Sequence, residues 1–355
     1  MSRLKARFPV NPKSTGSISF DEPGLLLSMN VRYNREDGIL QLDQRQAIEL
    51  LATKFGVTSK PPRSLPISSD LDLPKLKAAE VDAIEYLSII GSCLHIAQVS
   101  RPDIAYAVGY LARHSATPGV AHRNAAIDLV NYLYHTRELY IEYRRDNSGR
   151  GNVPELFEKG SRPSGPHGET QVDDEVPIER RLVASVPVPA GNKPDFFMDS
   201  DYAGDKDTRR STSGFVTMFN GGPVAWQSKL QKLCAQSSAE AEIYAVTDSV
   251  KEALHIRLLC EECEIRKPGV PVRVHEDNNA AIMMGHGLRG SNAAKHFQVR
   301  LRFLHEHVRD KSIEFARINT ADQLADGFTK ALPGPAFFKF RNQVLKGRPS
   351  EFTPG

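Results

Sequence analysis

The chain has few cysteines, no long apolar run and almost no net charge. Four cysteines among 355 residues do not suggest the disulfide framework that holds small secreted domains together. No segment approaches the roughly 18 consecutive apolar residues of a membrane span, and the first residues lack the apolar stretch of a secretory signal. Because Lys+Arg 46 nearly balance Asp+Glu 43, nucleic-acid binding would depend on local basic clusters. These absences predict an intracellular, non-secreted protein with no membrane partner.

Cys260 and Cys263 are the one cysteine pair with a spacing that zinc sites use. They lie within a predicted helix, and no second Cys/His pair follows at the spacing of a zinc finger. We therefore predict structural cysteines.

Composition divides the chain into five segments. Residues 1–23 have charge, proline and glycine but little periodicity, which is typical of a frayed or truncated N-terminus. Residues 24–143 and 194–345 have the periodicity of folded domains. Residues 144–193 are rich in proline, glycine, serine and charge and offer little apolar surface to offset chain entropy, so they predict a disordered linker. Residues 346–355 form a tail.

The first domain is predicted to be mostly helical. Residues 25–31 and 38–42 are candidates for paired strands, and residues 44–56 for a helix that ends at a glycine. Apolar residues at helical spacing predict three more helices, at about residues 86–96, 103–114 and 120–134.

The second domain begins with an apolar run that ends in acid. Phe196–Met198 predict a buried strand, and because side chains alternate along a strand, Asp199 and Asp201 would leave it on one face. Residues 213–219 and 223–229, joined by the turn residues Asn220, Gly221 and Gly222, predict a hairpin.

A helix follows the hairpin and begins at a capping signal. Ser237 with Glu240 three residues later fits a capping box, which leaves Glu242 as the carboxylate without a structural role. Residues 270–276 then predict a strand with Asp277 at its C-terminal end.

The last strand is predicted over residues 312–319. Thr320 with Gln323 offers a second capping box, for a helix that carries Asp322 and Asp326 on one face. The whole pattern predicts an α+β or α/β fold. It has a mixed five-stranded sheet, three antiparallel then two parallel strands, flanked by helices. Acids from separate elements would converge at one end of this sheet.

Seven sequence blocks in this order resemble the ribonuclease H domain of copia-type (Pseudoviridae) LTR retrotransposon Pol polyproteins. The blocks are Asp199-Ser-Asp201-Tyr-Ala-Gly-Asp205, Arg210-Ser-Thr-Ser-Gly214, Trp226-Gln-Ser-Lys229, Ser237-Ser-Ala-Glu-Ala-Glu242, Asp277-Asn278, Lys295-His296 and Ala325-Asp326-Gly-Phe-Thr-Lys330. The first domain resembles the reverse transcriptase thumb and connection region of the same polyproteins, at Gly91-Ser92, Arg101-Pro-Asp-Ile104, Pro118, His122, Tyr132-Leu133 and Thr136.

The resemblance implies a ribonuclease H-like fold and a two-metal phosphodiesterase. Asp199, Glu242, Asp277 and Asp326 would be both the catalytic residues and the ligands of two Mg²⁺ or Mn²⁺ ions. Carboxylate oxygens without Cys or His ligands suit these hard ions. Asp199 would bridge both ions. Glu242 and Asp277 would hold the ion near the leaving oxygen, and Asp326 the ion that activates water.

Neighbouring acids leave the ligand assignment open. Each of four other carboxylates is an alternative ligand: Asp201, Asp205, Asp322 and Glu276.

Basic and histidine side chains near the acids have two interpretations. Lys295 and His296 are auxiliary candidates, His296 because its pKa near neutrality suits proton shuttling. A structural histidine at a helix start is the more common alternative. Arg209, Arg210, Lys229 and Lys232 are predicted to bind nucleic-acid phosphates, with ordinary solvated charge as the alternative.

The chain also departs from the family pattern. Copia-type sequences usually have a basic residue and Ser/Thr before the Lys-His pair, where this chain has Ala293-Ala294. They have a histidine later in the same helix, where this chain has Arg302. Gly327 replaces an apolar residue and would cost a helix interior about 1 kcal/mol. The polymerase palm of this family holds its two metal ions with a Tyr-x-Asp-Asp motif. The only Asp-Asp pair in this sequence is Asp173-Asp174, in the linker. We therefore expect no polymerase activity from this chain.

We predict a retrotransposon ribonuclease H, a metal-dependent endonuclease that hydrolyses the RNA strand of RNA–DNA hybrids during reverse transcription. Its partners would be the hybrid, the reverse transcriptase palm and fingers, and other Pol products, in a cytoplasmic virus-like particle or in the nucleus. One alternative is a decayed retroelement remnant that only binds nucleic acid, which the intact set of four acids disfavours. The other is an integrase or resolvase of the same fold, which residues 237–242 and 325–330 disfavour.

Overall fold

The computed structural model describes residues 24–26, 28–145, 194–266, 268–288 and 295–348. The predicted N-terminal segment 1–23, the linker from residue 146 on, with its Asp173-Asp174 pair, and the end of the tail lie outside the described residues. Within the described residues, every helix is too short or too polar to cross a membrane.

The first region combines helices with a small antiparallel sheet. The sheet has the order β1 (Gly24–Leu26), β2 (Met29–Asn34), β3 (Ile39–Asp43) and β4 (Ile141–Arg144). The helices are α2 (Arg45–Lys54), α3 (Ala83–Val99), α4 (Ala105–Ala112), which follows the 3-10 turn η2 (Pro102–Ile104), and α5 (Val120–His135).

One strand prediction for this region is wrong, and one strand was not predicted. The single strand predicted over residues 25–31 is wrong, because the backbone turns at Ser28, whose φ is 68°, and pairs Leu26 with Met29. Strand β4 was not predicted. It pairs with β3, which lies far earlier in the chain, so no local pattern announces it.

A buried ion-pair network between η2 and α5 contains motif residues of the first region. Arg101, at 1% exposure, donates from Nε and Nη2 to both carboxylate oxygens of Asp103 at 2.9 and 2.8 Å. Its Nη2 also donates to Thr136 Oγ1, and the Tyr132 hydroxyl donates to Asp103 Oδ2 at 2.6 Å. These motif residues therefore hold two helices together, which is a structural role.

The second region contains the predicted mixed sheet. Its strands have the order β7 (Gly222–Leu230), β6 (Thr212–Phe219), β5 (Asp195–Asp201), β8 (Val272–Glu276) and β9 (Ile313–Arg317). β5, β6 and β7 are antiparallel, β8 runs parallel to β5, and β9 runs parallel to β8. The predicted ribonuclease H-like fold is therefore confirmed. The hairpin turns at Asn220 and Gly221, both at positive φ, as a two-residue turn requires.

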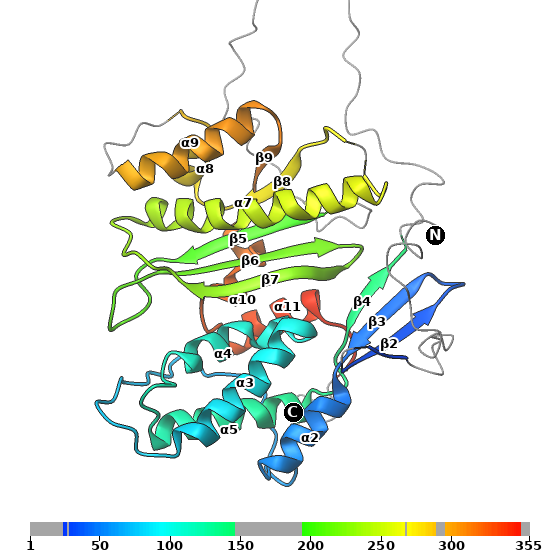
Figure 1. Cartoon of the computed structure of the whole chain (residues 1–355), viewed down its shortest axis with the longest axis vertical. Helices are drawn as coiled ribbons and strands as arrows, with labels where there is room; N and C mark the ends of the chain where they lie inside the picture. The colour runs from blue at the N-terminus through cyan, green and yellow to red at the C-terminus, as the bar shows by residue number, and fades with distance from the viewer. Residues whose placement is uncertain (1–23, 27, 146–193, 267, 289–294, 349–355) are drawn as a thin grey trace, which may run out of the picture.

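Helices cover both faces of this sheet (Figure 1). They are α7 (Ser238–Glu262), α8 (Asn279–Gly285) and α9 (Lys295–Arg309) on one face, and α10 (Asp326–Thr329) and α11 (Gly334–Val344) on the other. The first face has its own apolar core, with Phe196, Met198 and Val274 beneath α7. The helices α3, α4 and α5 lie beyond α10 and α11, as Figure 1 shows.

One hydrophobic core joins the two regions. It runs from Phe197 and Val216 of the sheet, through Phe328 and Phe337, to the helices of the first region. The Phe337 ring lies 5.9 Å from the Tyr132 ring in an edge-on contact. The indole of the half-buried Trp226 in β7 donates to the Ala97 carbonyl of α3 at 2.8 Å. The described parts of both predicted domains therefore pack as one body.

A partly buried ion pair joins α4 to the loop that follows β5. Arg113 Nη1 lies 3.0 Å from Asp205 Oδ2, and Nη2 donates to Thr212 Oγ1 at 3.1 Å. Asp205 Oδ1 accepts hydrogen bonds from the backbone and hydroxyl of Thr208. The carboxylate of Asp205 is thus used to hold this loop.

We expect Arg113→Met to lower the free energy of unfolding by about 3 kcal/mol, because it leaves the Asp205 charge buried and unpaired. Lys206→Gln is the control, since Lys206 pairs with Asp72 at the surface, and it should cost less than about 1 kcal/mol. Urea unfolding of the two variants measures the difference, and equal costs would contradict the coupling of α4 to the loop.

Candidate metal centre

Strand β5 carries Asp199 to the carboxyl end of the sheet. Asp199 is 6% exposed and lies opposite Gly214 of β6. A side chain at position 214 would not fit, because its Cβ would lie 2.7 Å from the Cβ of Phe328. Gly214 therefore lets α10 approach the sheet beside Asp199.

Helix α7 carries Glu242 toward Asp199 from one face of the sheet. Ser237 Oγ accepts from the Glu240 backbone N–H at 3.1 Å, and the Glu240 carboxylate accepts from the Gln236 backbone and from the Tyr244 hydroxyl. Glu240 thus has the predicted structural role at the helix start. Glu242 is 5% exposed, and its Oε2 has no hydrogen-bond partner.

The turn after β8 places Asp277. Asn278 caps α8, since its side chain accepts from the backbone N–H groups of Ala280 and Ala281. Glu276, the last residue of β8, is fully buried. It accepts from the Asn278 backbone at 3.0 Å, and its Oε2 is unpartnered. Because neighbouring residues at a strand end point to different sides, Glu276 turns inward and Asp277 is left half-buried at the surface.

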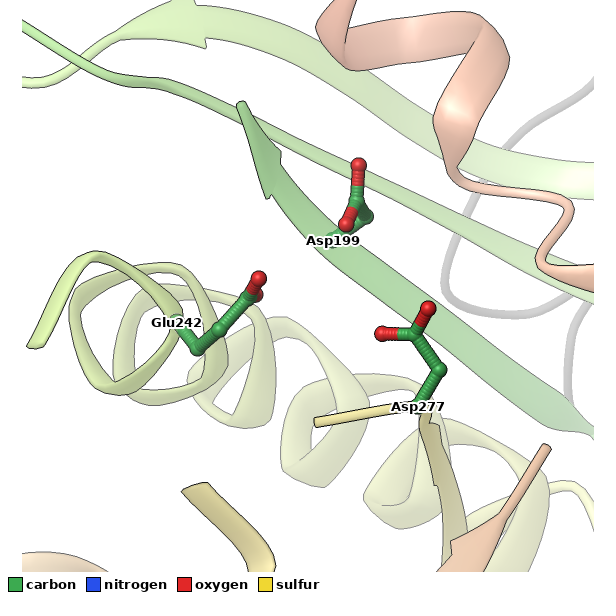
Figure 2. A group of neighbouring side chains, drawn as sticks. All are labelled: Asp199, Glu242 and Asp277. Carbon is green, nitrogen blue, oxygen red and sulfur yellow. The ribbon is translucent and has the colours of Figure 1, made fainter. Parts of the chain in front are cut away.

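Three of the predicted ligands meet. Asp199, Glu242 and Asp277 each offer a carboxylate oxygen, and these oxygens lie within 4.8 Å of one another (Figure 2). Oxygens that share one Mg²⁺ ion at about 2.1 Å lie at most about 4.2 Å apart, so small side-chain rotations suffice. The unpartnered Oε2 of Glu242 and the purely carboxylate donor set fit a hard divalent ion.

The fourth predicted ligand lies on a shorter helix than expected. The capping box of Thr320 with Gln323 does not form. Residues Thr320–Asp322 make a 3-10 turn (η4), and Gln323 Nε2 donates to the Met198 carbonyl of β5. Asp326 then opens α10, which has only four residues. Asp326 is outside the group of three acids, while Asp322 is exposed and pairs with Lys339.

Two site residues were not predicted from the sequence. The Thr329 hydroxyl donates to Asp199 Oδ2 at 2.5 Å, and Lys330 Nζ lies 3.0 Å from Asp326 Oδ1. Both belong to the block 325–330, at spacings of three and four from Asp326. On a helical turn these spacings share one face, which was the available signal.

The glycine in this block has a local explanation. Gly327 lies inside a four-residue helix, and a Cβ there would meet the Phe340 ring at 2.6 Å. The expected cost in a long helix interior therefore does not apply. The close ring contact requires a residue without a side chain.

The other predicted residues lie at varied distances from the three acids. Asp201, a half-buried acid, and Asp205 line a cavity of about 380 Å³ between the loop after β5 and α4. Lys229 and Lys232 line a second cavity, of about 590 Å³, with Lys251 and Arg300.

The remaining candidates are exposed or undescribed. Arg209 and Lys295 are exposed and Arg210 is half-buried, while the side chain of His296 lies outside the described part of the chain. Ala293-Ala294 are also undescribed, and Arg302 pairs with Glu306 at the surface.

Burial and mutual repulsion disfavour charge in this group of acids. Burial raises the pKa of Asp199 to about 6, with the charge of Asp326 as the next cause, against the Thr329 hydrogen bond and the Lys330 charge. Burial, and then the charge of Glu276, raises the pKa of Glu242 well above its usual range. Burial likewise raises the pKa of Glu276. A bound cation would remove this penalty.

These shifts set the sign of a pH effect. The pKa of Asp199 rises from 3.8 unfolded to about 6 folded, so its favourable contribution is complete below pH 3.8 and is lost as the pH passes 6. Relative to Asp199→Asn, the metal-free wild type should lose about 2 kcal/mol of stability between about pH 4 and pH 7. Urea unfolding at both pH values, with and without Mg²⁺, measures it. Mg²⁺ should abolish the loss, and a loss that Mg²⁺ leaves unchanged would contradict a metal centre.

The strand order and directions define the second region as a ribonuclease H-like domain. Comparison with known proteins identifies the proteins to which the whole chain is similar. No protein-family model matches the chain. The chain is 28% identical over 333 residues to the retrovirus-related Pol polyprotein from transposon TNT 1-94 of Nicotiana tabacum, covering 90% of this chain and 22% of that protein. It is 29% identical over 307 residues to the Pol polyprotein from transposon RE1 of Arabidopsis thaliana, covering 86% and 18%.

These relatives confirm the predicted similarity to copia-type Pol polyproteins. The chain spans about a fifth of their length. Among solved structures, LC11-RNase H1 in complex with an RNA/DNA hybrid aligns with 39% of this chain and 94% of that chain, at 11% identity and a TM-score of 0.31.

Proposed function

We propose that this chain is the ribonuclease H part of a retrotransposon Pol polyprotein and cuts the RNA strand of RNA–DNA hybrids. The observation that carries the proposal is the convergence of Asp199, Glu242 and Asp277 from three distant segments to within 4.8 Å. Acids that repel one another in a buried place have no structural benefit, whereas two-metal phosphodiesterases need such a group.

Each acid would have a definite role in holding the ions. Asp199, Glu242 and Asp277 would hold one Mg²⁺ or Mn²⁺ ion, and Asp326 would join Asp199 at a second. Bound divalent ions supply a water with lowered pKa and neutralise charge on the phosphate and the leaving oxygen. Thr329 fixes the orientation of Asp199 through its 2.5 Å hydrogen bond. Glu276 is fully buried, and its charge acts on the neighbouring ligand Glu242.

A cavity lined by basic side chains supports the proposal of a nucleic-acid substrate. Lys229, Lys232, Lys251 and Arg300 surround about 590 Å³ between β7, α7 and α9. Lys251 and Arg300 pair with Asp248, which also lines this cavity, so Lys229 and Lys232 are the cations that can hold the phosphates of one strand while the acids act on the other. Selection of RNA for cutting would come from contacts with its 2′-hydroxyl groups.

The relatives support the biological setting that we propose. Both are Pol polyproteins of transposons, so the partners of this chain would be the palm and fingers of a reverse transcriptase and other Pol products. The place of action would be a virus-like particle in the cytoplasm, or the nucleus.

Cleavage of a labelled RNA–DNA hybrid, with Mg²⁺ and then Mn²⁺, tests the proposed function. The wild type should cut the RNA strand and leave matched double-stranded DNA and RNA intact. Asp277→Asn should lower the rate at least about 100-fold, because it removes a metal ligand. Asp322→Asn is the matched control, since Asp322 is an exposed acid bonded to Lys339, and it should cut like the wild type.

Two outcomes would contradict the proposal. A wild type that binds the hybrid but cuts it with neither metal would favour the decayed remnant. Equal loss of cutting in Asp277→Asn and Asp322→Asn would mean that the acids act through stability and not at a shared site.

A further inference from the structure

Lys330 is a cation inside the group of acids. Its Nζ lies 3.0 Å from Asp326 Oδ1, one helical turn away on α10. The two side chains are 42% and 18% exposed, so the pair is only partly screened by water. Of the four predicted ligands, Asp326 alone is ion-paired within the described residues.

The lysine also interacts with acids beyond Asp326. Burial alone would lower the pKa of Lys330, but the charges of Asp199, Asp326 and Asp201, with the hydrogen bond to Asp326, raise it. The charge of Lys330 in turn opposes the rise in the pKa of Asp199. The ammonium therefore neutralises part of the repulsion between Asp199 and Asp326.

Asp326 lies next to Asp199 but outside the group of three acids. Asp326 is close enough to raise the pKa of Asp199, yet it is not in the group whose oxygens lie within 4.8 Å. The structure thus shows one group of three acids, and beside it a pair of acids that shares a lysine.

There is room for the lysine to move. Lys330 lines the cavity of about 380 Å³ whose wall includes Asp201. Asp201 is half-buried, and its own pKa is raised, chiefly by burial. It is an acceptor that a displaced ammonium group could reach without entering the group of three acids.

We propose that the Lys330 ammonium is a resident cation at the second metal position and that the second ion binds only when Lys330 leaves Asp326. This inference rests on the proposed function, because it takes the two-metal centre as given. It assigns the lysine of the block 325–330 a role in ion binding and makes the two metal positions unequal. The first ion has no competitor among the described side chains, and the second competes with a fixed positive charge.

The charge on Lys330 should therefore weaken the second ion more than the first. Two like charges a few Å apart repel each other even at the effective dielectric constant of a protein surface. Replacing the lysine by a neutral residue of similar length should strengthen the binding of the second ion about tenfold or more. The affinity of the first ion should change less.

Mn²⁺ titration of the full chain by calorimetry and by electron paramagnetic resonance tests this role at constant pH and ionic strength. Lys330→Gln should bind the second ion at least about tenfold more tightly than the wild type. Lys330→Arg keeps the charge and should stay close to the wild type. Lys339→Gln is the matched control, because Lys339 makes the same 3.0 Å pair with Asp322 at the surface.

The outcomes distinguish failure of the inference about Lys330 from failure of the proposed function. If the wild type binds two ions and Lys330→Gln binds the second no more tightly, the lysine is not a competitor and the inference fails alone. A lower melting temperature of Lys330→Gln without tighter second-ion binding also overturns the inference, since it shows a structural role only. If the wild type binds no Mn²⁺, the metal centre and the role of Lys330 fail together.

Discussion

Repulsion among buried carboxylates is the constraint on which this structure depends. Asp199 and Glu242 are almost fully buried, Asp277 faces them within 4.8 Å, and the buried Glu276 adds a further acid behind Glu242. Burial and repulsion in this group raise the pKa values of Asp199, Glu242 and Glu276 and cost stability unless a cation joins the group. A fold that keeps this arrangement must hold each acid on a rigid element that other contacts stabilise.

The surrounding structure provides that rigidity. Asp199 and Asp277 lie at the carboxyl ends of parallel strands, and Glu242 lies in the first turns of a capped helix. Helix α10 reaches Asp199 because Gly214 leaves room for it, and the shared core behind α10 connects the acids to the helices of the first region. The first region therefore supports the site through packing and through the pair of Arg113 with Asp205.

Local sequence signals predicted the parts of the fold that depend on the spacing of apolar residues and on the residue types of turns and helix caps. The strand at 196–198, the hairpin at Asn220 and the cap at Ser237 all follow from short patterns, and they place Asp199 and Glu242. The sequence could not predict long-range partners. Three features depend on residues far away in the chain: strand β4, the pairing of Arg113 with Asp205, and the hydrogen bond from Gln323 to β5. The predicted role of each acid stays a prediction, although the structure brings three of them together.

The location of bound Mn²⁺ tests the central claim most directly. A crystal structure of the full chain with Mn²⁺, examined by anomalous scattering, should show a peak bounded by the carboxylates of Asp199, Glu242 and Asp277. The same crystals of Asp277→Asn should lose this peak while keeping the fold. A wild-type peak elsewhere on the chain, or no peak at saturating Mn²⁺, would contradict the account of these acids as a metal centre.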